Sequence, residues 1–173
     1  MENIVRRHFG DGAQIKSKGY EGCAKLCRKG ARDIKAWILR GMTRVIVCHD
    51  ADSNDPTKVR EKVIKAVLHP SGFSGAACVT IPVEEIEAWI IADEAAITAV
   101  IPSFKFTGHP SPETIHDPKE WLCRQSRASN GKPLYSPATF NPAVAKELRF
   151  EVVAKKCPSF KAFMNWLNNP VPI

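Results

Sequence analysis

The fold of this chain is decided by the stretch Arg44-Val45-Ile46-Val47-Cys48-His49-Asp50-Ala51-Asp52. Its first five residues form a mostly apolar, β-branched run, which is typical of a strand buried on both faces of a sheet. The pair Asp55-Pro56 then predicts the start of a helix, with Asp55 as N-cap and Pro56 in the first turn. A second strand is expected over residues 76–82. Strand, helix and strand in close succession indicate a βαβ unit and therefore a parallel sheet.

The rest of the chain is expected to be mainly helical. Apolar residues at three- and four-residue spacing between Cys23 and Ile38 predict an amphipathic helix of about 20 residues, preceded by a polar, extended piece from Ala13 to Lys18. Further helices are expected over residues 2–9, 83–101, 118–126, 142–150 and 158–168. We expect one domain over residues 1–173, with an α/β core in residues 1–101 and a loop-rich, helical extension in residues 102–173.

Composition and charge describe an ordinary globular protein with an uneven charge distribution. Of 173 residues, 44% are hydrophobic and 25% charged, and the net charge is +7. Residues 1–47 hold 11 basic and 4 acidic residues, residues 48–101 hold 4 and 9, and residues 102–173 hold 10 and 5. An acidic centre between basic flanks suits a metal site beneath a nucleic-acid backbone. Uneven surface charge without a function explains the same pattern.

Several classes of protein find no support. No apolar run is long enough for a membrane span, and the start lacks the features of a signal peptide, so a cytoplasmic protein with no membrane partner is expected. The six cysteines are expected to be reduced, without a zinc site. The glycine motifs of P-loops, serine hydrolases and dinucleotide-binding folds are absent, so no organic cofactor is expected.

The first candidate site is the pair Asp50 and Asp52, directly after the apolar strand. Residues two apart in an extended segment point the same way, and the carboxyl ends of strands are where α/β sheets place ligands. Two close carboxylates repel each other unless a cation lies between them. Mg²⁺ (or Mn²⁺) is therefore the expected metal. The alternative is a polar turn in which Asp55 merely caps a helix.

A second acidic cluster, Glu84, Glu85 and Glu87, follows the second expected strand and should emerge at the same sheet edge. Acidic residues in the first turn of the helix expected over residues 83–101 would favour its dipole, which accounts for Glu84 and Glu85. A dipole role explains Glu87, close to the apolar Trp89, less well. Glu87 is therefore the predicted third metal ligand or general base.

Basic residues supply the predicted phosphate contacts. Lys119 lies in a proline-punctuated region where a loop can close over a phosphate. The predicted nucleic-acid-binding residues are Lys16, Lys18, Arg124, Arg127 and Lys132. The alternative for every one of these residues is an ordinary solvated surface charge.

Four segments together carry a family resemblance. The strand with Asp50-Ala51-Asp52 is similar to the D-x-D element of TOPRIM domains, the metal-binding fold of topoisomerases, primases and overcoming-lysogenization-defect nucleases. With the other segments, the chain resembles one prokaryotic TOPRIM-like family of unknown function that often neighbours ATPase genes in settings suggestive of phage defence. Those segments are Glu85-Ile86-Glu87-Ala88-Trp89-Ile90-Ile91-Ala92-Asp93, Ser111-Pro112-Glu113 with Asp117-Pro118-Lys119-Glu120-Trp121-Leu122, and Pro158-Ser159-Phe160.

This resemblance implies a TOPRIM-like (Rossmannoid) parallel sheet flanked by helices, with a helical C-terminal portion. It also implies a Mg²⁺-dependent nuclease centre with Asp50 and Asp52 as metal ligands, and an ATPase as partner. Glu87, Asp93 and Lys119 match motif positions, and Glu87 and Lys119 are the catalytic candidates. TOPRIM domains carry a further Glu, commonly in an E-G pair at the end of a first strand. That strand is absent from this sequence as given, and Glu21-Gly22 lies too far along to replace it.

Three functions follow as expectations. The first is a metal-dependent nuclease of an anti-phage defence system, acting on DNA or RNA and working with an ATPase. The second is a catalytically degenerate TOPRIM module that acts as a non-enzymatic partner or regulator in an ATPase-containing complex. The third and weakest is a nucleotide-sugar transferase, because a D-x-D pair after a strand also binds metal diphosphates. Oligomer formation is left open.

Overall fold

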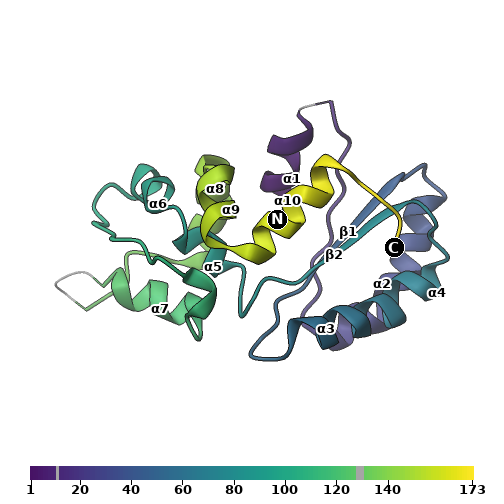
Figure 1. The fold of residues 1–173 in the computed structure, drawn as a ribbon, viewed down its shortest axis with the longest axis horizontal. Helices are drawn as coiled ribbons and strands as arrows, with labels where there is room; N and C mark the ends of the chain where they lie inside the picture. The colour runs from purple at the N-terminus through teal and green to yellow at the C-terminus, as the bar shows by residue number, and fades with distance from the viewer. Residues whose placement is uncertain (11, 128–130) are drawn as a thin grey trace.

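A computed structural model describes residues 1–10, 12–127 and 131–173 of the chain. It contains two parallel strands, β1 (Arg44–Cys48) and β2 (Ala76–Thr80), paired in register along their whole length. The predicted βαβ unit is therefore confirmed. Within the described residues the sheet has these two strands and no third, so the protein is a mixed α/β fold made mostly of helices (Figure 1).

The connection between the strands is a helix that changes its winding. α3 (Pro56–Val63) begins as predicted, with the Asp55 carboxylate accepting a hydrogen bond from the Thr57 N–H at 2.8 Å. The helix then passes through a π-helical turn, η1 (Ile64–Leu68), and ends in α4 (His69–Ser71). An N-cap carboxylate satisfies backbone N–H groups that lack a helical partner, which is why local sequence identified this helix start.

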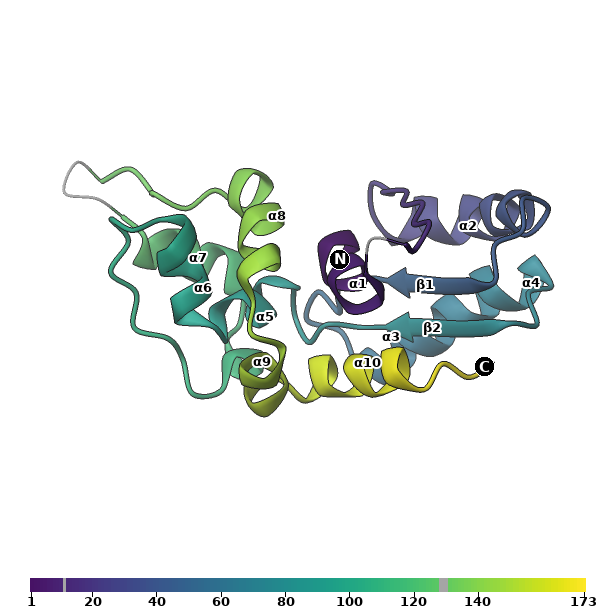
Figure 2. The same cartoon turned by 90° about the horizontal axis from the view of Figure 1, so that it is seen from above.

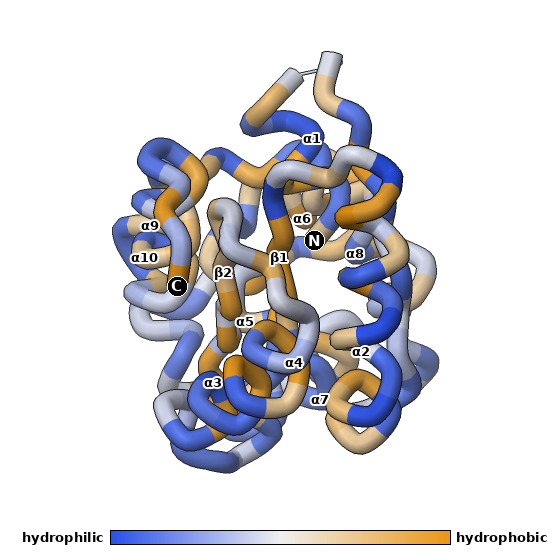
Figure 3. The backbone as a smooth tube through the Cα atoms, turned by 90° about the vertical axis from the view of Figure 1, so that its right-hand side faces the viewer, coloured by the Kyte–Doolittle hydropathy of each residue, from blue (hydrophilic) through white to orange (hydrophobic). Residues whose placement is uncertain are grey.

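Helices cover both faces of the sheet. α2 (Cys23–Ile38) and η1 lie on the face formed by Val45 and Val47. The two helices can pack closely because Gly30 has no side chain, since a Cβ there would lie only 2.8 Å from Val67. α1 (Glu2–Phe9) and α10 (Pro158–Asn168) belong to the second core, to which Ile46 and Cys78 contribute. Figure 3 shows the consequence, with hydrophobic strands in the centre and hydrophilic turns outside. Side chains alternate between the faces, as a strand between two layers requires.

The remaining helices build a second lobe beside the sheet (Figure 1). Its centre is Trp89, fully buried and in ring contact with Phe160 and Phe163 of α10. α10 thus joins the helical lobe to the sheet, and the Ala77 N–H of β2 donates to the Val171 carbonyl at 3.2 Å. The helices of this lobe are α5 (Glu87–Ile91), α6 (Glu94–Val100), the short 3₁₀ turn η2 (Pro112–Thr114), α7 (Pro118–Gln125), α8 (Pro137–Glu147) and α9 (Phe150–Lys156).

Two helix predictions are wrong. The single helix expected over residues 83–101 is two short helices, because Asp93 ends one and caps the next through the Ala96 N–H. Glu84 lies outside both, with a φ of 59°, so Glu84 and Glu87 do not share a helix face. The helix expected over residues 142–150 is displaced, since α8 ends at Glu147 and α9 begins at Phe150. No helix of the described residues is long and apolar enough to cross a bilayer.

Candidate functional site

The acidic residues meet at the carboxyl ends of the two strands, as predicted. Three backbone hydrogen bonds join the loops that leave β1 and β2: His49 N–H to Thr80, Ala51 N–H to Pro82 and Asp52 N–H to Glu84, at 3.2, 3.1 and 3.0 Å. The Asp50 carboxylate also accepts from the Ile86 N–H at 2.9 Å. The two acidic segments are therefore held together as extensions of the parallel pair.

Asp50 and Asp52 line one cavity of about 270 Å³, together with Tyr20, Gly22, Cys48, His49 and Ile86. Asp52 and the following Ser53 have positive φ values of 48° and 61°, a conformation that aspartate tolerates better than most residues. Although the Glu21-Gly22 pair is distant in sequence, the fold places its glycine in this lining. The exposed Glu21 carboxylate instead pairs with Lys25.

Asp50 is the most perturbed carboxylate of the site. Burial, with the nearby charges of Glu87, Asp52 and Glu85, raises the pKa of Asp50 to about 7, against the opposing hydrogen bond from the Ile86 N–H. No Lys, Arg or His in the described part of the chain forms an ion pair with it. A half-buried carboxyl surrounded by like charges is the electrostatic signature of a cation or proton site.

Glu87 is buried at the start of α5 and is fixed by a relay from α8. Its Oε1 accepts a hydrogen bond from Asn141 Nδ2 at 2.9 Å, and Asn141 Oδ1 accepts from the Tyr135 hydroxyl. Burial and the Glu87 charge raise the pKa of Tyr135, so its hydroxyl stays protonated. No sequence signal connects Glu87 with a residue so far along the chain, and the relay was not predicted.

Glu84 and Glu85 tie loops together at the rim of the site. Glu85 Oε2 accepts from the Lys119 backbone N–H at 2.8 Å, and burial raises the pKa of Glu85. Glu84 Oε2 accepts from the Ser53 hydroxyl at 3.0 Å and lies 3.6 Å from His116 Nδ1. Lys119 is thus anchored by its backbone while its side chain is exposed at the rim.

The structure separates the residues predicted to contact phosphates. Lys16 and Lys18 are exposed on the extended piece before α2, where Lys18 Nζ pairs with Asp33 at 2.6 Å. Arg124 is exposed near the end of α7, and Arg127 follows just beyond it, in the helical lobe (Figure 1). Lys132 is exposed in the same lobe. These residues do not form one patch.

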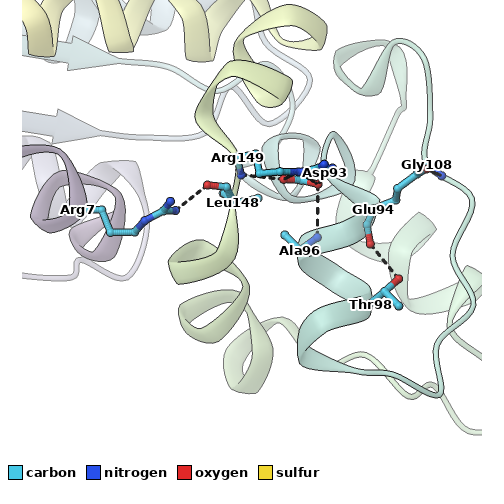
Figure 4. A network of polar contacts seen from close by, with 8 residues as sticks. All are labelled: Arg7, Asp93, Glu94, Ala96, Thr98, Gly108, Leu148 and Arg149. Carbon is cyan, nitrogen blue, oxygen red and sulfur yellow. Dashed lines mark hydrogen bonds and ion pairs between the residues drawn. The ribbon is translucent and has the colours of Figure 1, made fainter.

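Asp93, which matches a motif position, is a structural residue. It is fully buried, and Arg149 donates to it from the backbone N–H at 2.7 Å and from the guanidinium at 2.6 Å (Figure 4). Burial alone would raise the pKa of Asp93, but the hydrogen bonds from Arg149 outweigh it and hold the pKa below its usual value. The pair joins the start of α6 to the α8–α9 connection.

The described residues provide two carboxylate ligands for a divalent cation, Asp50 and Asp52. Among the described residues no three Asp, Glu, His or Cys side chains come together as a metal-binding group. Mg²⁺ is usually held by one or two carboxylates, with waters and phosphate oxygens in the other positions. Asp50 and Asp52 on one cavity meet that requirement. Glu87 does not line this cavity, so its role as third ligand stays a prediction.

Comparison with known proteins identifies a family and nothing finer. A search of the curated proteins finds no match to this chain, and neither does a search of the solved structures. One family model, described as Domain of unknown function (DUF4276), matches residues 1–168. Since that match covers nearly the whole sequence, the chain belongs to this family.

Proposed function

We propose that this protein is a metal-dependent nuclease that hydrolyses phosphodiester bonds of DNA or RNA. The observation that carries the proposal is Asp50, half-buried at the carboxyl end of β1. Its pKa is raised by burial and by three neighbouring carboxylates, and it has no ion-pair partner among the described residues. A structural carboxylate is normally neutralised, whereas a ligand or base is left available. The TOPRIM-like relationship, with service in anti-phage defence, is part of the proposal.

In this proposal Asp50 and Asp52 hold Mg²⁺ or Mn²⁺. When bound there, such a cation would supply a Lewis acid for the scissile phosphate and would lower the pKa of a water molecule. Glu87, whose orientation is fixed by Asn141, keeps its predicted role as general base, although it does not itself line the cavity of Asp50 and Asp52. The exposed ammonium of Lys119, anchored beside Glu85, positions a phosphate oxygen at the rim.

Exposed cations on α2 and α3 offer the phosphate backbone a path to this site. Both helices begin at the loops that surround the carboxylates, and both lie on one face of the sheet. Electrostatic attraction to several such side chains supplies most of the sequence-independent affinity for nucleic acids. The exposed cations of these helices that form no ion pair within the described residues are Arg28, Lys29, Lys35, Lys58, Arg60 and Lys62.

The test is cleavage of supercoiled plasmid and of single-stranded RNA with Mg²⁺, with Mn²⁺ and with EDTA. We expect metal-dependent cleavage by the wild type and at least a 100-fold loss in Asp50→Ala, because the ligand pair is broken. Asp55→Asn is the matched control, since Asp55 lies in the same loop but only caps α3. Equal cleavage by wild type and Asp50→Ala in clean preparations contradicts the proposal.

The alternative function is a catalytically degenerate module that regulates an ATPase-containing complex. It is favoured by one observation: the described residues bring no third carboxylate into the cavity of Asp50 and Asp52, and no three potential ligands come together as a metal-binding group. The two functions are separated by the same assay together with co-expression of a neighbouring ATPase. A wild type that cuts neither substrate, yet forms a stoichiometric complex with that ATPase and changes its hydrolysis rate, supports the alternative.

A further inference from the structure

Two of the six cysteines lie side by side on the first turn of α2. All six are free thiols, and the Sγ atoms of Cys23 and Cys27 are 3.7 Å apart. Both side chains are half-buried, so a small reagent in the solvent can reach them. The other four cysteines make no such contact with one another within the described residues. This pair is therefore the place in the described chain where two thiols can react with each other.

A disulfide between Cys23 and Cys27 requires the first turn of α2 to change shape. Sulfur atoms joined by a disulfide are about 2 Å apart, so the two Sγ atoms must approach each other. In a regular helix, residues four apart have Cα atoms about 6 Å apart, which a disulfide can span, but their Cβ atoms are about 2 Å too far apart. The bond therefore closes only if the backbone between the two cysteines leaves helical geometry.

The first turn of α2 is the part of the helix where such a change disrupts least. The first N–H groups of any helix have no helical acceptor, so distortion there breaks fewer hydrogen bonds than it would in the interior. The N-cap is Gly22, with a φ of 86°, and no side chain caps the free N–H groups. Across this turn the Leu26 N–H donates to the Gly22 carbonyl at 3.2 Å. Unwinding the turn would break that hydrogen bond.

We propose that Cys23 and Cys27 are a redox-active pair that a peroxide closes to a disulfide, and that closure unwinds the first turn of α2. This turn is close to the carboxylate cavity, because α2 runs alongside β1 and starts near its carboxyl end (Figure 2). Gly22 and Tyr20 line that cavity, and the Gly22 N–H donates to the Tyr20 carbonyl at 3.0 Å. The disulfide thus reshapes one wall of the cavity. The inference does not depend on the proposed nuclease activity.

The redox step balances between the two thiols and one hydrogen peroxide. Burial and the neighbouring Cys23 thiol raise the pKa of Cys27, so Cys23 is the sulfur that attacks first. The Cys23 thiolate displaces one peroxide oxygen as hydroxide, which is protonated to water, and a sulfenic acid remains on Cys23. The Cys27 sulfur then attacks the Cys23 sulfur, the S–O bond breaks, and a second water leaves with the Cys27 proton. Two electrons pass from the thiols to the peroxide.

The test treats the reduced full chain with equimolar hydrogen peroxide and then alkylates the remaining thiols under denaturing conditions. The number of alkylated cysteines should fall from six to four. Trypsin cuts after Lys25, so the fragments that carry Cys23 and Cys27 stay joined only through the disulfide and separate on reduction with dithiothreitol. Cys23→Ser and Cys27→Ser should each abolish the linked fragments. Cys123→Ser is the matched control, because Cys123 is also half-buried and its loss should leave the linkage unchanged.

Hydrogen exchange followed by NMR in the reduced and oxidised chains tests the unwinding. The Leu26 amide should exchange at least tenfold faster after oxidation, because its hydrogen bond to Gly22 is lost. The Leu39 amide, which donates to the Lys35 carbonyl at the far end of α2, is the internal control. Six alkylated cysteines after peroxide, a linkage between other cysteines, or a disulfide with unchanged exchange at Leu26 overturns the inference. So does a loss of thiols that dithiothreitol does not reverse.

Discussion

Asp50 is half-buried and Asp93 is fully buried, but only Asp93 has a positively charged partner among the described residues. Asp93 is neutralised by Arg149, which donates from both its backbone and its guanidinium (Figure 4). Asp50 receives one backbone N–H and is otherwise surrounded by Asp52, Glu85 and Glu87. The pKa of Asp93 is lowered and that of Asp50 is raised to about 7.

The ionised Asp93 carboxylate therefore stabilises the folded state, whereas the ionised Asp50 carboxylate destabilises it. A paired buried charge repays its desolvation through hydrogen bonds, so removing its partner is costly. A buried charge among like charges reduces stability, and proteins retain such groups where a ligand or a reaction needs them. In the proposed function the Asp50 loop is therefore the functional region, whereas Asp93 is part of the scaffold.

The largest expected stability effect comes from removing the Asp93–Arg149 ion pair. Asp93→Asn should lower the free energy of unfolding by about 3 kcal/mol at pH 7, because the fully buried side chain loses its charge-assisted hydrogen bonds to Arg149, whose own side chain is half-exposed. Since the pKa of Asp93 is lowered by folding, its stabilisation is present above the unfolded-state pKa and is lost as the pH falls through the folded-state value. Urea unfolding at pH 7 and pH 3 measures both. Exposed Glu147→Gln is the control, and an equal effect from it would contradict the assignment.

The next largest effect is expected at Asp50, where removing the charge should increase stability instead of lowering it. Asp50→Asn should raise the free energy of unfolding by about 2 kcal/mol at pH 8 in EDTA, because the amide keeps the shape without the charge. The pKa of Asp50 is raised by folding, so its favourable contribution is present at low pH and is lost as the pH rises through about 7. The wild type and Asp50→Asn should therefore reach equal stability only below the unfolded-state pKa of aspartate, about 4. A variant less stable than wild type at pH 8 would show that Asp50 is structural.

A smaller effect sharpens the comparison with a ligand. Binding to the folded state alone stabilises a protein by mass action, by about 1 kcal/mol when the free ligand is a few times its dissociation constant. Millimolar Mg²⁺ should raise the melting temperature of the wild type at pH 8 and leave that of Asp50→Asn unchanged. Ca²⁺ and Na⁺ at matched ionic strength are the controls. An identical shift in wild type and variant would place the cation elsewhere.

The smallest stability effect concerns Lys119. Lys119→Ala should change the free energy of unfolding by less than about 0.5 kcal/mol, because its structural contact is made by the backbone and its side chain is exposed. Cleavage should fall about tenfold through a higher KM if the ammonium positions a phosphate. Lys119→Arg is the matched control and should retain most activity. A loss of kcat with KM unchanged would instead give Lys119 a chemical role.

Local features were predictable from sequence because they depend on residues a few positions apart. The apolar run of β1 and the capping of α3 by Asp55 needed no distant partner. The meeting of the two acidic segments was also predictable, since parallel strands end at one edge. The helix expected over residues 83–101 failed for the converse reason. At its break Asp93 caps the next helix, and the Asp93 side chain is held in place by Arg149, 56 residues further along the chain.

The sequence by itself determined where the carboxylates stand along the chain and which of them follow a strand. Only the tertiary structure decided which carboxylate receives a hydrogen-bonding or charged partner, because pairing depends on which distant helix packs beside it. Asp93 meets Arg149 at the α8–α9 connection, and Glu87 meets Asn141 of α8. Asp50 forms no ion pair with an arginine or a lysine in the described chain, and it differs from Asp93 because its burial beside other carboxylates is not offset by a cation.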